Sequence, residues 1–464
     1  MFQKDQVARL RSLGINTCFY NTLITDDEKK FIINDLNRSD CQYEFLFLSP
    51  EGLMSQQMFS CLINLEQKDR INFFVIDEAH CIVTWGGHFR PDYAKLSVLK
   101  EKFDVPVIAL TGTATSSSII TIKSSLGISG CPVVKLPSYR PNLYFFVLLK
   151  PESKVKEFII NYVSEHCADD CAIVYCGTQS RSTMLALDLK EHGISATYYH
   201  AGMEESEKVR NANAWFSGQF KVICCTSAFG MGVDKKDVRH VIHFSMPSSI
   251  EDYVQESGRA GRDGDSARCV LFYSFSDRST HIQHLAEIEN LVLRQEKFDN
   301  INVITKYCTM VTGCRQIFIS NYFNNRLEKT CGLCDLCELT SVTQCSKVDF
   351  TTTTFKLLIC LRNMILIHPY IKMSQLVSTF MGSKSKEIVD KKFNSCSGYG
   401  DGKPIFKFTT KASKFIEFLV IEDILRENCK QTRDNQFLVH LSCDTQKALN
   451  ILNSSEKVFY SVPM

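Results

Sequence analysis

The stretch that decides the fold of this chain is an apolar run leading directly into two acids: Phe73-Phe74-Val75-Ile76-Asp77-Glu78-Ala79-His80. Continuous apolar runs of this length are typical of strands buried on both faces of a parallel sheet. In open parallel sheets, ligands bind just beyond the carboxyl ends of the strands. Asp77 is therefore a candidate ligand of Mg²⁺, and Glu78 a candidate base for an attacking water. An acidic turn after a buried strand is the plain alternative.

Similar runs recur along the chain as far as about residue 275, with helical stretches between them, so the expected fold class is α/β. Prolines interrupt this pattern at residues 137–141, where we place a domain boundary. Beyond about residue 276 the strand runs stop, and the last hundred residues have a helical pattern that ends in a short strand pair. The other expected strands are residues 45–48, 107–110, 172–175, 222–225 and 241–244.

The composition is that of a soluble globular protein, with 44% hydrophobic and 22% charged residues. A length of 464 residues predicts three or four domains. The net charge of +2 excludes a uniformly basic nucleic-acid binder. We expect no membrane-spanning helix and no secretory signal, because the chain has no long apolar run and no apolar segment at its start. Most of the 21 cysteines lie in apolar runs, which indicates buried, reduced thiols inside a cell.

Residues 255–264 place two arginines three positions apart, so we expect Arg259 and Arg262 on one helical face. Guanidinium groups match phosphate oxygens, and one that reaches across a cleft would act as an arginine finger. A surface arginine pair is the alternative. Small-residue turns at 111–115 and 228–234 allow backbone amides to approach phosphates closely, although a tight structural turn explains them equally well.

Four cysteines have the spacing of a metal site, Cys-x16-Cys-x2-Cys-x2-Cys: Cys314, Cys331, Cys334 and Cys337. Four thiolates complete a tetrahedral zinc site with no open position, so this metal would support folding rather than catalysis. Cys308 is a rival for the first ligand position. Free core cysteines are the alternative to a metal site.

The ordered series of motifs resembles superfamily 2 helicases of the DEAH type, and specifically the RecQ family. The resemblance implies an ATP-driven DNA helicase that moves 3′ to 5′, with ATP, Mg²⁺ and Zn²⁺ as cofactors. It implies that Asp77, Glu78 and Arg262 are catalytic, with Arg262 as the finger, and that further residues surround the nucleotide. The resemblance rests on residues 77–80, 111–115, 175–178, 199–203, 228–234 and 255–264, and the nucleotide-binding residues it implies are His80, Gly230, Asp234, Gln255 and Arg259.

The resemblance also implies DNA contacts. Residues 81–93 are similar to the aromatic-rich loop of the family, with Trp85, Phe89 and Arg90 available to a single strand, although Gly87 and His88 depart from the usual His-Asp. The last part resembles a winged helix, with Phe437 and Arg433 in its wing, and Ile416, Leu419, Val420 and Ile424 on one helix face. The implied partners are single-stranded and branched duplex DNA and DNA-repair proteins, in the nucleus and away from membranes.

The expected division is a partial RecA-like domain over 1–137, a second RecA-like domain over 138–276, a zinc module over 277–345 and a winged helix over 346–464. The sequence has no match to the phosphate loop Gly-x-x-x-x-Gly-Lys-[Ser/Thr]. We therefore expect an N-terminally truncated first domain whose sheet edge and apolar surface are exposed. A catalytically inactive DNA-binding fragment is the second hypothesis, and a purely structural zinc scaffold is the third.

Overall fold

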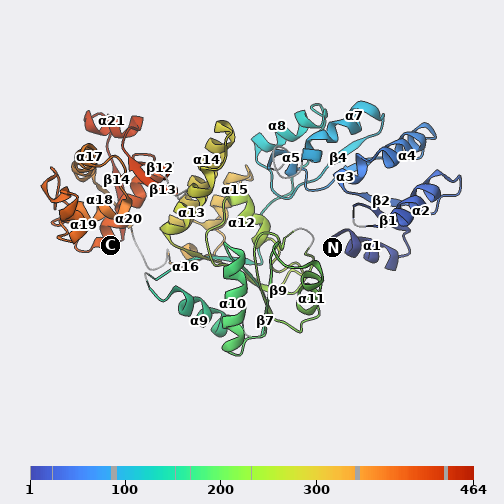
Figure 1. The fold of residues 1–464 in the computed structure, drawn as a ribbon, viewed down its shortest axis with the longest axis horizontal. Coiled ribbons are helices and arrows are strands. Elements are labelled where there is room, and N and C mark those ends of the chain that lie inside the picture. The colour runs from blue at the N-terminus through green and yellow to red at the C-terminus, as the bar shows by residue number, and fades with distance from the viewer. Residues whose placement is uncertain are drawn as a thin grey trace.

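A six-stranded sheet forms the centre of the molecule (Figure 1). The computed structural model describes residues 2–22, 24–84, 91–151, 153–167, 169–230, 233–339, 345–432 and 437–463. All neighbouring strands of this sheet are parallel, in the order β5-β10-β9-β6-β8-β7. The strands are β5 (Leu143–Leu149), β6 (Cys171–Tyr175), β7 (Ala196–Tyr199), β8 (Val222–Cys225), β9 (Val238–His243) and β10 (Ala267–Tyr273).

Both faces of this sheet are buried, as the continuous apolar runs predict. Ala172 and Val174 of β6 pack with helices α9 (Val155–His166) and α10 (Gln179–Glu191). Ile173 and Tyr175 pack on the opposite face with α11 (Glu205–Phe216) and α12 (Ile250–Ser257). The α/β fold class is therefore confirmed for this part of the chain.

The first part of the chain contains two separate two-stranded parallel sheets, β1–β2 and β3–β4. Its core gathers around α2, α4 and α7. The elements are α1 (Phe2–Ser12), β1 (Thr17–Tyr20), α2 (Asp26–Asn37), β2 (Phe45–Leu48), α3 (Pro50–Leu53), α4 (Gln56–Gln67), β3 (Phe74–Ile76), α5 (Cys81–Thr84), α6 (Pro91–Ala94), η1 (Lys95–Ser97), α7 (Val98–Lys102), β4 (Val107–Ala109) and α8 (Ser116–Ser125).

The expectation of burial on both faces is wrong for β2, β3 and β4. Phe73, Val75, Ile108 and Leu110 are between 43% and 49% exposed, although their pattern matches that of the fully buried β6. The reason is physical: a two-stranded sheet has no further strands or second layer to cover both of its faces. The expectation of exposed apolar sheet surface in this part is confirmed.

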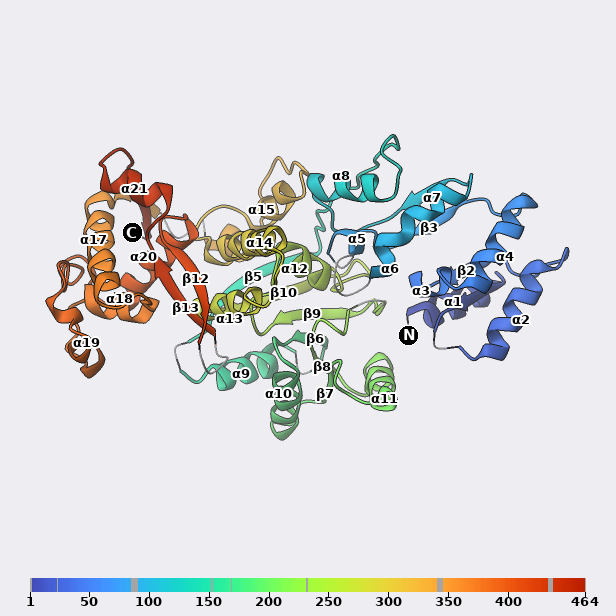
Figure 2. The same ribbon diagram turned by 45° about the horizontal axis from the view of Figure 1, so that its top comes forward.

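Helices follow the central sheet and lead into the cysteine cluster: α13 (Phe275–Leu285), α14 (Leu291–Thr309), α15 (Arg315–Tyr322) and α16 (Asp335–Leu339). Residues after 344 form a separate core of helices and short antiparallel strand pairs, and they lie beyond α13 and α14 from the first part (Figure 2). These elements are β11 (Cys345–Asp349), α17 (Thr351–Ile367), α18 (Met373–Phe380), α19 (Lys386–Asp390), η2 (Phe393–Ser395), α20 (Thr409–Ile421), β12 (Arg426–Gln431), β13 (Phe437–Ser442), α21 (Gln446–Leu452) and β14 (Phe459–Pro463).

The short strand pair expected near the end of the chain is present as β12 and β13. A second pair, β11 with β14, was not expected. The apolar face expected on the last long helix is present in α20, where Ile416, Leu419 and Val420 are buried. Ile424 is buried too, three residues after the helix ends. Among the described residues, none of the helices combines the length and the apolar character that crossing a membrane requires.

Candidate active site and zinc site

The acid pair lies immediately after β3, as the sequence predicts. Asp77 is exposed, and its carboxylate accepts a hydrogen bond from the amide of Glu78 at 2.9 Å. Glu78 has a φ of +50°, a conformation that non-glycine residues adopt rarely and that is concentrated at functional sites. This turn directs two carboxylates to the carboxyl end of a parallel strand.

His80 connects the acids to the segment that follows β4. Its Nδ1 lies 3.2 Å from a carboxylate oxygen of Glu78 and 3.0 Å from the hydroxyl of Thr111. The same hydroxyl accepts the amide of Thr113 at 3.3 Å, and the amide of Ala79 donates to the Leu110 carbonyl at 2.8 Å. Two motifs separated by 30 residues in the sequence therefore form one hydrogen-bonded unit.

The expectation that the two arginines share a helical face is wrong. Helix α12 ends at Ser257, so Arg259 and Arg262 both lie in the turns that follow it. Arg259 is buried with 5% exposure, whereas the side chain of Arg262 is 35% exposed. Of the two, only Arg262 can meet a ligand without rearrangement of the core.

Asp234 and Gly230 lie close to these two arginines. The carboxylate of Asp234 contacts the guanidinium of Arg262 at 2.8 Å, and Arg9 of α1 at 3.5 Å. A Cβ atom at Gly230 would lie 3.0 Å from Nη2 of Arg259, so a glycine permits this close approach. Gln255 is half-buried in the last turn of α12.

A buried polar pair beneath this segment was missed in the sequence. Nε2 of His243 lies 2.9 Å from the carboxylate of Glu256, and burial raises the pKa of Glu256. His243 also stacks on Tyr175, whose hydroxyl donates to the Phe229 carbonyl at 3.1 Å. The available signal was a histidine inside an otherwise apolar strand run, since buried polar groups require partners.

The cysteine cluster assembles as expected. The sulfur atoms of Cys314, Cys331, Cys334 and Cys337 all lie within 4.8 Å of one another. A tetrahedral zinc with Zn–S bonds of about 2.3 Å separates its sulfurs by about 3.8 Å, so this donor set fits zinc. Cys308, the rival first ligand, is buried in the core and is not part of the cluster.

The cluster is joined to the central sheet through Asp335. Its carboxylate accepts two hydrogen bonds from Arg315, at 2.9 and 3.0 Å, and one from the amide of Val147 at 3.0 Å. Val147 lies in β5, an edge strand of the sheet. The amide of Arg315 also donates to the sulfur of Cys334 at 3.4 Å. A metal at the cysteines would therefore stabilise the sheet edge as well.

Two of the expected DNA-contacting elements are described only in part. Trp85, Phe89 and Arg90 lie outside the described residues, directly after α5. Phe437 begins β13, is half-buried, and its carbonyl accepts a hydrogen bond from Gln283 of α13 at 3.2 Å. Arg433 lies outside the described residues.

Four family models match successive parts of the chain. They are described as DEAD/DEAH box helicase (residues 2–122), helicase conserved C-terminal domain (154–264), RecQ zinc-binding (275–338) and RQC domain (344–463). Together with the parallel sheet and the acid and arginine motifs, these matches place the chain in the DEAD/DEAH box helicase class. Within this class, the RecQ zinc-binding match over the cysteine cluster and the RQC match indicate one family. The chain belongs to the RecQ family.

Curated relatives agree with this assignment. The chain is 38% identical over 325 residues to the RecQ-like DNA helicase BLM of Xenopus laevis, which covers 69% of this chain and 24% of the relative. It is 32% identical over 439 residues to the ATP-dependent DNA helicase hus2/rqh1 of Schizosaccharomyces pombe, and this match covers 93% of this chain and 32% of the relative. It is 30% identical over 481 residues to the ATP-dependent DNA helicase Q-like 4B of Arabidopsis thaliana, and this match covers 99% of this chain and 41% of the relative. The chain thus spans between a quarter and about two-fifths of the length of these relatives.

Proposed function

We propose that this protein is an ATP-dependent DNA helicase that moves 3′ to 5′ and separates duplex DNA during replication, recombination or repair. The observation that supports this proposal best is the unit formed by Glu78, His80 and Thr111, because it joins the acid motif to the next helicase motif at the end of a strand. The names of the relatives are consistent with it. The division at residues 137, 276 and 345, with a winged helix at the end, is part of the proposal.

Each site residue has a proposed role. Asp77 holds Mg²⁺, and Glu78 orients and deprotonates the water that attacks the terminal phosphate. Arg262 stabilises the charge that develops on the transferred phosphoryl group. The surface that faces the nucleotide is formed by Gly230, Asp234, Gln255 and Arg259. His80 transmits the state of the nucleotide to the segment that contains Thr111.

The donor chemistry of the residues present fits part of an ATP site. Two carboxylates of the kind that Mg²⁺ prefers and an accessible guanidinium are present, whereas the sequence contains no match to the lysine-containing phosphate loop. Bound ATP would supply the phosphoanhydride whose cleavage drives movement on DNA. The chain's own residues would orient the water and neutralise charge.

The proposed zinc is structural, and the proposed DNA contacts come from two separate segments of the sequence. Four sulfur ligands leave zinc no open position for catalysis. Trp85, Phe89 and Arg90 would stack on or pair with a single strand, and Phe437 would meet the duplex at the wing. Single-stranded and branched DNA are the proposed partners, together with DNA-repair proteins in the nucleus.

The direct test is the DNA-stimulated ATPase activity of the purified chain beside its Glu78→Gln variant. We expect kcat to fall by about 10²–10⁴-fold in the variant, the usual contribution of a positioned general base. Glu101→Gln, at an exposed position of α7, is the matched control and should retain full activity. A Glu78→Gln variant with the same ATPase activity as the wild type would contradict the proposed role of Glu78 as the base.

The second candidate function is a DNA-binding protein without ATPase activity. The observation that favours it is the lack of a phosphate-loop match in the sequence. It predicts salt-dependent binding of single-stranded DNA, measured by fluorescence anisotropy, without any DNA-stimulated phosphate release. Phosphate release that requires Glu78 would reject this candidate.

A further inference from the structure

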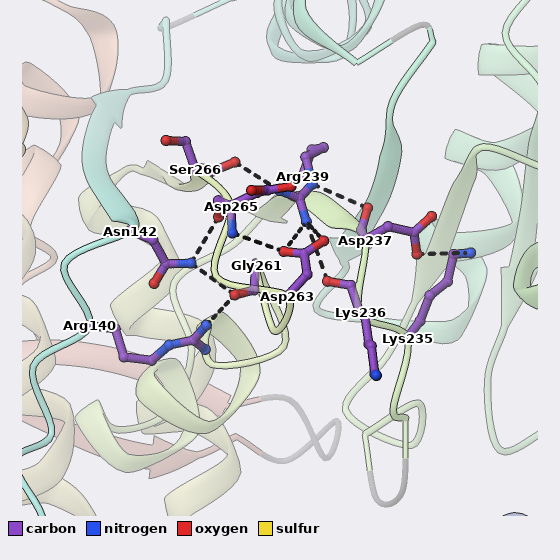
Figure 3. A network of polar contacts seen from close by, with 10 residues as sticks. All are labelled: Arg140, Asn142, Lys235, Lys236, Asp237, Arg239, Gly261, Asp263, Asp265 and Ser266. Atoms are coloured by element: carbon purple, nitrogen blue, oxygen red, sulfur yellow. Dashed lines mark hydrogen bonds and ion pairs between the residues drawn. The ribbon is translucent and has the colours of Figure 1, made fainter.

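The loop that contains Arg262 is held in place by side chains from outside the loop (Figure 3). We define the arginine loop as residues 258–266, between the end of α12 and the start of β10. We define the linker as residues 131–142, which lie between α8 of the first part and β5 of the central sheet. Residues 131–140 of the linker have no regular structure.

Two linker side chains donate hydrogen bonds to the backbone of the arginine loop. The guanidinium of Arg140 donates to the carbonyl of Gly258 at 3.0 Å and to the carbonyl of Gly261. The side-chain amide of Asn142 donates to the carbonyls of Gly261 and Asp265, both at 2.8 Å. These contacts join positions 118 to 123 residues apart in the sequence.

Gly261 shows how closely the two segments pack. Its φ is +54°, in the left-handed region that glycine adopts without penalty. A Cβ atom here would lie 2.5 Å from the side-chain nitrogen of Asn142 and 2.7 Å from the carbonyl oxygen of Asp265. The residue directly before Arg262 is therefore fixed against the linker.

The residue directly after Arg262 is fixed from the opposite side. Arg239 of β9 contacts both carboxylate oxygens of Asp263, at 2.6 and 2.5 Å, and its guanidinium also donates to three backbone carbonyls. The Asp263 carboxylate in turn accepts the amide of Asp265 at 3.1 Å. Figure 3 shows both supports around the loop. The backbone on each side of Arg262 is thus restrained, whereas the Arg262 side chain extends to Asp234.

We propose that Arg140 and Asn142 are positioning residues that couple the linker between the two motor halves to the arginine finger. Because both donate to carbonyls of the arginine loop, a displacement of the linker changes the position of Arg262 relative to the nucleotide. This inference rests on the proposed ATPase function. It adds a route by which the relative movement of the halves controls hydrolysis.

The test compares Arg140→Gln and Asn142→Ala with a charge-loss control, Arg210→Gln, at an exposed arginine of α11. We expect kcat of the DNA-stimulated ATPase to fall by about 10–100-fold with little change in KM, since a misplacement near 1 Å has effects of this size on chemistry. Arg140→Lys, which donates without the planar fork, should recover part of the loss.

A merely structural role is distinguished by repeating the substitutions in an Arg262→Ala background. If Arg140 and Asn142 act by positioning Arg262, they should have no further effect on kcat once that guanidinium is gone. An equal loss in both backgrounds would overturn the proposal. Zinc content and thermal unfolding of each variant establish that the chain is folded.

Hydrogen exchange provides a readout independent of ATPase activity. The amides of residues 258–266 should exchange at least about tenfold faster in Arg140→Gln, while those of β10 stay protected. Unchanged exchange in the loop would overturn the inference whatever the ATPase activity. A wild-type chain without ATPase activity would contradict the proposed function, and faster loop exchange in the variant would still support the coupling of linker and loop.

Discussion

Arg278 of α13 and Glu427 of β12 form an ion pair with an Nε–Oε2 distance of 2.5 Å, and both side chains are almost fully buried, at 0% and 2% exposure. The guanidinium also donates to Asn302 at 2.6 Å and to Thr305 at 3.2 Å, both on α14. These contacts join the β12–β13 hairpin to the helices that precede the cysteine cluster. The hairpin is therefore anchored by a buried ion pair in which each charged group needs the other as its partner.

Breaking this pair should be strongly destabilising. We expect Arg278→Met or Glu427→Leu alone to lower the free energy of unfolding by about 3–5 kcal/mol, because the remaining buried group loses its partner. The double variant Arg278→Met/Glu427→Leu should lose much less than the sum. Urea unfolding of all four proteins measures this coupling.

The neighbouring exposed pair is the control for that cycle. Arg426 and Asp423 lie 3.4 Å apart with side chains about half exposed. The substitution Arg426→Met removes this ion pair and should change the free energy of unfolding by no more than about 1 kcal/mol. Additive effects at Arg278 and Glu427 would mean that the two residues act independently.

The other side of α13 faces the central sheet. Asp277 pairs with Lys150 at 2.8 Å and accepts the amide of Met246 at 3.3 Å, and His281 contacts the Met246 carbonyl at 2.7 Å. Lys150 directly follows β5. Neighbouring residues of α13 thus contact the region around the central sheet on one side and the β12–β13 hairpin on the other, which joins these two parts.

The His281 contact predicts a pH dependence of stability. Burial lowers the pKa of His281, so as pH falls the unfolded chain binds a proton before the folded chain does. The free energy of unfolding should therefore decrease as pH falls below about 6.5, by at most about 1.4 kcal/mol per pH unit for this group. His281→Gln, which can still donate to the carbonyl, should reduce that slope. An unchanged slope in His281→Gln would contradict this prediction.

The sequence predicted strands well and their surroundings less well. The run that became β6 and the run that became β3 look alike, because both are short and continuously apolar. Yet β6 is buried on both faces, and Val75 of β3 is 49% exposed. An apolar pattern records which side chains favour burial, and it does not specify which strands or helices cover them.

The site was predictable where its residues are close in sequence. Asp77 and Glu78 are adjacent and directly follow an apolar run, and the four clustered cysteines have a recognisable spacing, so these patterns indicated candidate site residues. Arg140 and Arg278 gave no such signal, because each is an ordinary charged residue. Arg140 contacts Gly258, and Arg278 pairs with Glu427, in both cases across more than a hundred positions of sequence. Contacts of this kind depend on the packing of whole elements.

Removal of zinc should loosen the sheet edge as well as the cysteine cluster. We expect Cys334→Ser to lose the bound metal and to unfold at lower temperature, since about 10 kcal/mol of apparent binding free energy supports folding at such sites. Asp335, next to Cys334, contacts Val147, so amides of β5 should exchange faster. Metal content measured by mass spectrometry should approach one zinc per chain in wild type.

Cys308→Ser is the matched control for the zinc site. Cys308 is a buried thiol near the cluster in sequence but not part of it, and burial raises its pKa. This variant should retain its zinc. Loss of zinc in Cys308→Ser with retention in Cys334→Ser would contradict the assignment of ligands.

The two arginines of the loop should differ in what their substitution costs. Arg262→Gln should change the free energy of unfolding by less than about 1 kcal/mol, because the guanidinium is partly exposed and pairs with a half-exposed Asp234. The same change should lower the DNA-stimulated kcat by about 10³–10⁵-fold, the usual contribution of an arginine finger. Arg259→Gln should instead destabilise the fold by about 1–3 kcal/mol, since Arg259 is buried beside Gly230. Urea unfolding and ATPase assays on both variants separate these effects. A stable Arg259→Gln protein without activity, beside a fully active Arg262→Gln protein, would assign the finger to Arg259 instead.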